Sequence, residues 1–228
     1  MYLVEKTINK LNSDGYSFFL NPKDLHDVTS RLKKNSYNIY KPYPDSEKNI
    51  IYQKKEPEII LFEIITNSPL RHQDILGTLY SLQIDDSLFG DIVITNNHYY
   101  FYTFSYMQSF FEMELVKIRN TNVSLVTHDI NFLKDYQPVF EEIQIITSSL
   151  RIDSVIAKII HTNRDQIKEL IKDKKIIYNY DLLTNPSKII HEKDTFSIRK
   201  YGKYKFEEIK ATTKKNNLIL KILKYTQN

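Results

Sequence analysis

Basic residues between positions 164 and 175 form the group whose spacing best suits binding of a ligand. Arg164, Lys168 and Lys172 recur every four residues, and Lys174 and Lys175 follow directly. Residues four apart lie on the same face of an α-helix, so the first three cations would form one ridge. Such a ridge can neutralise phosphates of a nucleic acid. The alternative is a solvated surface that keeps the chain soluble, and charge alone does not separate the two.

Two short helices are predicted to position this ridge. Ser148 or Ser149 can cap the first helix, and Thr162 and Asn163 precede the second. The second helix would bury apolar residues on the side away from the ridge. Strands are expected over 175–179 and within 194–209. The apolar positions of the two helices have helical spacing: Ile152, Val155, Ile156, Ile159, Ile160, Ile167, Leu170 and Ile171.

The charge of the chain is distributed unevenly. Residues 147–228 hold 18 Lys and Arg against 9 Asp and Glu, a net of +9. Residues 1–146 hold 14 against 19, a net of −5. A basic module joined to a mildly acidic remainder indicates that the C-terminal part binds a polyanion.

The composition excludes several kinds of site. The 228 residues include no Cys, which excludes disulfides, thiolate zinc sites and cysteine nucleophiles. The first twenty residues lack a basic segment followed by a long apolar run, and no run is long enough to span a bilayer. We therefore expect a cytoplasmic protein with no membrane partner.

The middle of the chain predicts a two-layer plait. The order of elements is β-α-β-β-α-β, which packs as an antiparallel sheet with two helices on one face. Residues 1–56 are expected to be mostly helical, with Asn21 as a cap before Pro22. The segments of the plait are 58–65, 71–83, 90–95, 98–105, 107–118 and 122–128.

The aromatic run Tyr99–Phe104 raises the possibility of base stacking by the plait. Alternation places Tyr99 and Phe101 on one face of the strand and the other aromatic residues on the opposite face. Some RNA-binding domains stack bases on the corresponding strand. However, residues 57–140 carry 4 Lys and Arg against 10 Asp and Glu, a net of −6. Packing is therefore favoured over stacking.

Catalysis finds little support in the sequence. Four glycines leave no P-loop and no dinucleotide fingerprint, and the six histidines have no metal-binding spacing. In the cluster Arg71–Asp74, His72 and Asp74 would point to different sides of a helix, which favours capping over acid–base chemistry. We predict no enzymatic activity, cofactor, metal site or small-molecule substrate.

Residues Leu150–Arg199 resemble the α-L RNA-binding motif, the small domain of ribosomal small-subunit protein four. The resemblance rests on an Arg-Ile-Asp opening, an Asn-Arg pair before the second helix, a strand ending in Asn179, and a Lys-Asp pair before the last strand. The family usually has Gly where Lys174, Tyr180 and Lys193 stand. The resemblance implies that RNA is contacted by Arg151, Arg164, Lys168, Lys172, Lys175 and Asn179.

Two further blocks resemble the bacterial YlmH family: "LRHQDILGTLYSLQIDDSLFGDIVI" at 70–94 and "RKYGKYKFEEI" at 199–209. This resemblance implies a multi-domain α+β chain. Residues 1–56 would be an N-terminal domain, 57–140 a plait like an RNA recognition motif, and 147–228 the α-L domain.

The same resemblance implies a function and partners. The chain is expected to bind rRNA and tRNA on the large ribosomal subunit, in quality control of subunits obstructed by peptidyl-tRNA. The alternative is an RNA-modifying enzyme similar to pseudouridine synthases, which would use the basic domain to deliver rRNA or tRNA.

Overall fold

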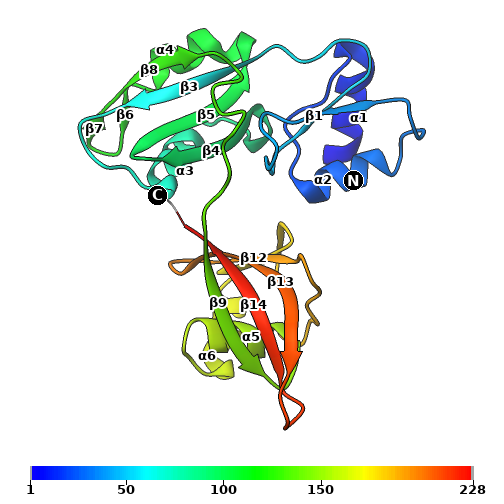
Figure 1. Cartoon of the computed structure of the whole chain (residues 1–228). Helices are drawn as coiled ribbons and strands as arrows, with labels where there is room; N and C mark the ends of the chain where they lie inside the picture. Colours follow the sequence, from blue (N-terminus) through cyan, green and yellow to red (C-terminus); the bar gives the residue numbers. More distant parts are fainter. Residues whose placement is uncertain (1, 227–228) are drawn as a thin grey trace. The chain divides into compact units, whose positions relative to one another are not determined.

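The chain is a multi-domain α+β protein in two compact units. The computed structural model describes residues 2–226. Residues up to 137 form the first unit, and residues 138–226 form the second. Both combine helices with antiparallel sheet, as the sequence predicts (Figure 1). The predicted division into three domains stays a prediction.

The N-terminal segment contains two helices and a small ribbon. Helix α1 spans Tyr2–Asp14, helix α2 spans Pro22–Thr29, and β1 (Asn38–Tyr40) pairs with β2 (Ile50–Tyr52). The side chain of Asn21 accepts a hydrogen bond from the backbone of Asp24, so the predicted cap is confirmed. The ribbon is an addition to the mostly helical segment that the sequence predicts.

The plait follows with the predicted order of elements. Its sheet has the strand order β4-β5-β3-β8, and all three pairings are antiparallel. Asn96 and Asn97 both have positive φ, as the two-residue turn between β4 and β5 requires. Helix α4 ends before residue 117 because β6 and β7 form a small hairpin there. The elements are β3 (Ile59–Ile65), α3 (His72–Ser81), η1 (Asp86–Leu88), β4 (Phe89–Thr95), β5 (His98–Phe104), η2 (Ser105–Met107), α4 (Gln108–Glu114), β6 (Lys117–Ile118), β7 (Thr121–Asn122) and β8 (Ser124–His128).

Both faces of the plait sheet are covered. Phe62 and Phe101 pack with Phe111 of α4 on one face. On the opposite face, Tyr102 and Phe104 are fully buried against residues of the N-terminal segment. The approach is close at Gly90, where a Cβ would lie 2.9 Å from the ring of Phe19. The aromatic run therefore packs instead of presenting a free surface for stacking.

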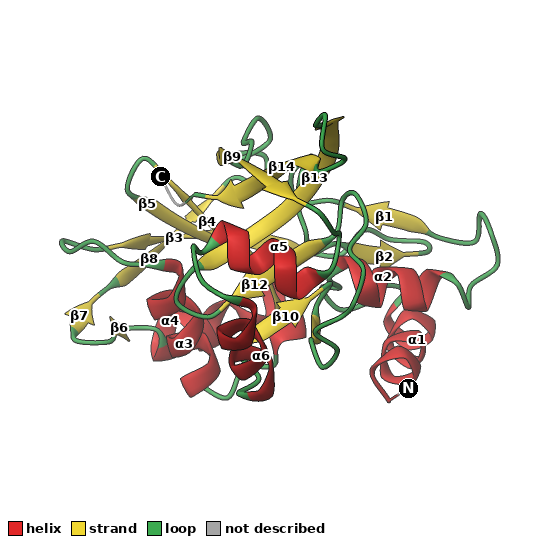
Figure 2. Cartoon of the chain, turned by 90° about the horizontal axis from the view of Figure 1, so that it is seen from below, coloured by secondary structure: helices red, strands yellow, loops and turns green. Residues whose placement is uncertain are grey.

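The second unit contains a six-stranded antiparallel sheet with two helices packed against it (Figure 2). The strand order is β11-β10-β12-β13-β14-β9. The outer pair β9 and β14 was not predicted from the sequence. The elements are β9 (Phe140–Thr147), α5 (Ile152–Ile159), α6 (Arg164–Lys172), β10 (Ile176–Tyr178), β11 (Asp181–Leu182), β12 (Thr195–Ile198), β13 (Gly202–Thr212) and β14 (Leu218–Tyr225).

Three turns of this unit keep a backbone conformation that usually favours glycine. Lys174, Tyr180 and Lys193 have φ values of 55°, 69° and 73°. After α6, the Lys174 amide donates to the carbonyl of Ile171 and the Lys175 amide to that of Leu170. This is the Schellman arrangement, in which the left-handed residue is commonly Gly. These three positions thus hold side chains in a conformation that glycine would adopt with less strain.

Replacing Lys174 by Gly should stabilise the second unit by roughly 0.5–1 kcal/mol. Gly adopts positive φ without the clash that an L side chain makes, although it also gains entropy in the unfolded chain. Urea unfolding of the full chain measures the difference. Lys174→Ala is the matched control, since it removes the same charge but keeps a Cβ, and it should not stabilise. Equal stabilisation by Ala and Gly would contradict the argument.

Candidate nucleic-acid interface

Helix α6 displays the predicted basic ridge. The Asn163 side chain accepts a hydrogen bond from the backbone of Gln166 and so caps the helix, while Ile167 and Ile171 are buried. The apolar side fixes the rotation of the helix. Arg164 and Lys168 consequently face solvent with about half of each side chain exposed (49% and 50%), and Lys172 is exposed as well. The ridge is defined here as Arg164, Lys168 and Lys172.

Arg164 also belongs to a second group of charges at the start of α5. Asp153 is fully buried, and its two carboxylate oxygens accept hydrogen bonds from two arginines. Arg151 donates from Nε to Oδ1 at 3.2 Å and from Nη2 to Oδ2 at 2.9 Å. Arg164 donates from Nη2 to the same Oδ2 at 2.8 Å. The structure therefore brings together two predicted RNA-contacting residues that lie 13 positions apart.

The two guanidinium groups determine the charge state of Asp153. Burial alone would raise the pKa of this carboxyl, but hydrogen bonds from Arg151 and Arg164 outweigh that effect and hold the pKa below its usual value. Because the folded-state pKa lies below the unfolded one, the group stabilises the fold at neutral pH. That contribution is lost as the pH falls and Asp153 becomes protonated.

The lysines of the interface make weaker, more exposed contacts. Lys168 lies 2.8 Å from Asp165, and Lys175 lies 2.5 Å from Asp173. Exposed ion pairs of this kind contribute little and can exchange partners at low cost. These lysines can therefore turn toward a phosphate without disturbing the fold.

Asn179 has a structural role in the turn after β10. Its side-chain Nδ2 donates to Oδ1 of Asp194 at 2.7 Å, and its side-chain Oδ1 accepts from the backbone of Thr195 at 2.8 Å. Asp194 also accepts hydrogen bonds from the Tyr178 hydroxyl and the His191 amide. Contact of Asn179 with RNA stays a prediction, while its two polar groups shape the turn.

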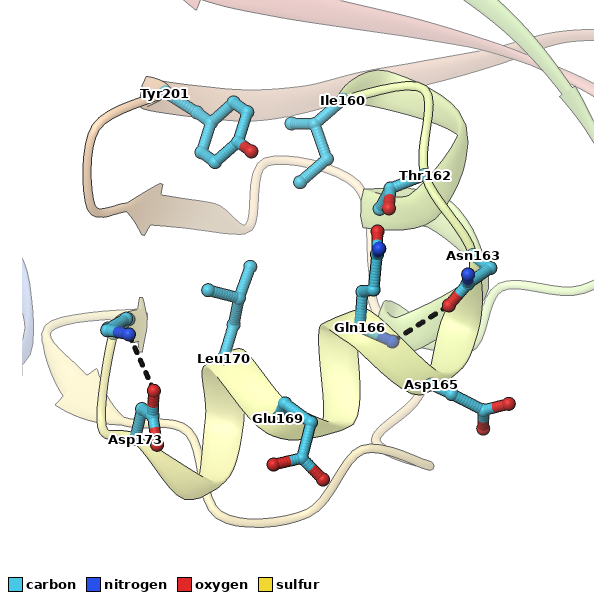
Figure 3. Close-up of a pocket in the computed structure, with 10 residues that line it drawn as sticks. Ile160, Thr162, Asn163, Asp165, Gln166, Glu169, Leu170, Asp173 and Tyr201 are labelled. Carbon is cyan, nitrogen blue, oxygen red and sulfur yellow. Dashed lines mark hydrogen bonds and ion pairs between the residues drawn. The ribbon is translucent and has the colours of Figure 1, made fainter.

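A row of carboxylates lies beside the ridge on α6 and borders a groove of about 610 Å³. Asp165, Glu169 and Asp173 recur every four residues along it, and Figure 3 shows them on the same helix as Leu170, with Tyr201 on another segment across the groove. Three carboxylates in a row repel a phosphate backbone. Two of them are paired with lysines, Asp165 with Lys168 and Asp173 with Lys175, so Glu169 is the carboxylate that would most oppose a phosphate beside the ridge.

Charged side chains also cluster in the first unit. Asp74 accepts a hydrogen bond from the backbone of Arg71 at 3.1 Å and ion-pairs with the Arg71 and Arg119 side chains, which fits the capping role expected from the sequence. Glu63 contacts Nδ1 of His98 at 2.5 Å and Nε2 of His128 at 2.6 Å. Sequence reasoning missed this second cluster. Within residues 2–226, no group of three or more His, Asp or Glu side chains is arranged to hold a metal ion.

Comparison with known proteins shows a family resemblance. Residues 53–131 match a family described as "Putative RNA-binding domain in YlmH". Over 146 residues the chain is 30% identical to the ribosome-associated protein quality control protein P2 of Bacillus subtilis strain 168. Over these residues the chain is similar to the YlmH family. The predicted resemblance is thereby confirmed.

The matches leave part of the chain uncovered. The alignment with the B. subtilis protein covers 64% of the chain and 56% of the relative, so it spans about half the length of that relative. The family match ends at residue 131, and the α-L character of residues 150–199 stays a prediction. The structure of the cell division protein YlmH from Streptococcus pneumoniae is 20% identical, with a TM-score of 0.47, covering 58% of this chain and 90% of that one.

The helices within residues 2–226 do not resemble membrane spans. Over the described residues 2–226, none combines the length and the apolar character needed to cross a bilayer.

Proposed function

We propose that this protein is a ribosome-associated RNA-binding protein whose second unit supplies most of the affinity. The observation that carries this proposal is the basic surface formed by the α6 ridge and Arg151. It stands on a unit that holds 18 Lys and Arg against 11 Asp and Glu over residues 138–226, a net of +7. Positive charge gathered on one face is the electrostatic signature of nucleic-acid binding.

The proposed RNA-contacting residues are of two kinds, arginines held in place and mobile lysines. Arg151 and Arg164 are held by a buried carboxylate and present ordered donors, whereas Lys168, Lys172 and Lys175 act as mobile point charges. Asn179 supports the turn that follows β10. All six residues lie in the unit that we propose binds RNA.

The plait makes at most a small contribution to RNA affinity in this proposal. Tyr102 and Phe104, which alternation places together, are fully buried. The net charge of residues 57–140 is −6, so phosphate contacts there would be opposed.

The setting proposed for this activity is the large ribosomal subunit that carries peptidyl-tRNA, with rRNA and tRNA as the RNA partners. Support comes from the name of the B. subtilis relative, a ribosome-associated protein quality control protein. We further propose that the protein acts by binding and not by catalysis, within the cytoplasm.

Co-sedimentation with purified ribosomal subunits tests the proposal. The full chain should pellet with large subunits at about 50 mM salt and be released as the salt rises toward about 500 mM, because phosphate contacts release counterions. An assay for modified nucleotides in the recovered RNA runs in parallel. Pelleting with neither subunit would refute ribosome association, and new modified nucleotides would favour an enzyme.

A further inference from the structure

The pairing of Arg151 and Arg164 has a geometric consequence beyond a row of charges. Both Nη2 atoms donate to one oxygen of Asp153, at 2.9 and 2.8 Å, so the two guanidinium groups are held as neighbours. They come from different elements: Arg151 stands at the N-cap position of α5, and Arg164 is the first residue of α6. In isolation, two such cations would repel each other, and the shared carboxylate between them offsets that repulsion.

We propose that Arg151 and Arg164 form one fork that binds a single RNA phosphate, and that Asp153 is the positioning residue that holds the fork. This inference rests on the proposed RNA-binding function and names how part of the surface works. Within the surface, Arg164 then functions with Arg151, while Lys168 and Lys172 function separately.

The donors that remain on the fork suit a phosphate. A guanidinium has five N–H groups in a rigid plane. Asp153 accepts hydrogen bonds from Nε and Nη2 of Arg151 but only from Nη2 of Arg164. The N–H groups on both Nη1 atoms therefore remain outside these contacts. Arginine binds phosphate through two parallel N–H donors, a geometry that lysine cannot reproduce.

Burial decides which part of the cluster is available to a ligand. Asp153 is fully buried, whereas the side chains of Arg151 and Arg164 are 34% and 49% exposed. The carboxylate is therefore inaccessible to RNA, and the cluster presents a net charge of +1 through its outer guanidinium edges. Ordering the arginines before binding lowers the entropy that the complex would otherwise lose.

Asp153→Asn separates this inference from simple electrostatics. The substitution preserves shape but removes a negative charge, so net charge alone predicts equal or tighter RNA binding. The fork predicts binding at least about tenfold weaker, because the asparagine amide cannot accept from both arginines at two oxygens. Fluorescence anisotropy of the full-length protein with labelled RNA extracted from large ribosomal subunits measures the affinity.

If circular dichroism shows that Asp153→Asn does not fold, arginine variants still test the fork. Arg151→Lys and Arg164→Lys preserve charge, and each should weaken binding severalfold because lysine lacks the planar donors. The double variant Arg151→Lys/Arg164→Lys should be no more than about twofold weaker than either single variant, since the two residues act as a unit. If the losses of affinity in the two single variants multiply in the double variant, the arginines act independently and the fork is wrong. Unchanged affinity for both single variants would also overturn it.

Lys168→Ala/Lys172→Ala, measured in the same assay, distinguishes failure of the fork from failure of the proposed function. If the lysine pair weakens binding while the arginine variants act independently, only the fork is wrong. If neither set changes the affinity, the basic surface itself does not bind RNA and the proposed function is wrong as well.

Discussion

A chain that ends at residue 137 should bind large-subunit RNA at least about 100-fold more weakly than the full chain at about 100 mM salt. Residues 1–137 hold 14 Lys and Arg against 17 Asp and Glu, a net of −3, so removal of the second unit reverses the sign of the net charge. Removing several phosphate-binding cations at once lowers affinity by orders of magnitude. Electrophoretic mobility shifts with labelled RNA from large subunits measure the difference.

The reciprocal fragment, residues 138–226, is the control for this truncation. It has its own buried core, which includes Ile156, Ile167 and Phe206, and therefore has the means to fold alone. Its affinity should lie within a few fold of that of the full chain. If the fragment 1–137 is folded by circular dichroism and binds as tightly as the full chain, RNA is bound by the first unit and the assignment is wrong.

Local patterns predicted the elements that position the basic surface. The stripe from Ile152 to Ile159 recurs with helical spacing, and Asn163 is a strong capping residue, so α5 and the start of α6 could be predicted from short segments. The shared face of the three ridge residues follows from their helical spacing alone. These features depend on residues within one or two turns of each other.

Features that depend on distant pairing were missed. β9 pairs with β14 at the far end of the chain, Ile145 opposite Leu220, and no local pattern joins these segments. Likewise, His98 and His128 contact Glu63 only because β5 and β8 flank β3 in the sheet. Alternation divided Tyr99–Phe104 between two faces, but only the fold shows that the N-terminal segment covers the second face.

The Asp153 cluster lies between these two cases. The sequence suggested that Arg151 and Arg164 share a surface, but it treated the ridge as three equivalent cations. The structure shows that Arg164 contacts a buried carboxylate. Removing the Arg164 side chain leaves the buried Asp153 carboxylate with one arginine partner fewer. Breaking a buried ion pair in this way can cost several kcal/mol of stability. A variant that includes Arg164→Ala therefore confounds binding with stability, and a test of the ridge is best made with its lysines.

Lys168→Ala/Lys172→Ala should reduce the salt dependence of RNA binding by about one to two units in the slope of log K against log [salt]. Each phosphate contact contributes roughly 0.7–0.9 to that slope. Stability should change by less than about 0.5 kcal/mol for each substitution, because both side chains are exposed and the Lys168–Asp165 pair is solvated. Affinity measured by anisotropy between about 50 and 300 mM salt gives the slope.

Lys214→Ala/Lys215→Ala is the matched control, since it removes the same two charges from the exposed turn between β13 and β14. If net charge alone attracts RNA, both double variants should lower the slope equally. If the ridge binds phosphates directly, only the α6 variant should lower it, while the control retains nearly the full slope. An unchanged slope for Lys168→Ala/Lys172→Ala with an intact fold would show that these lysines are a solvated surface, because a contacted phosphate must release its counterion whatever the geometry of the complex.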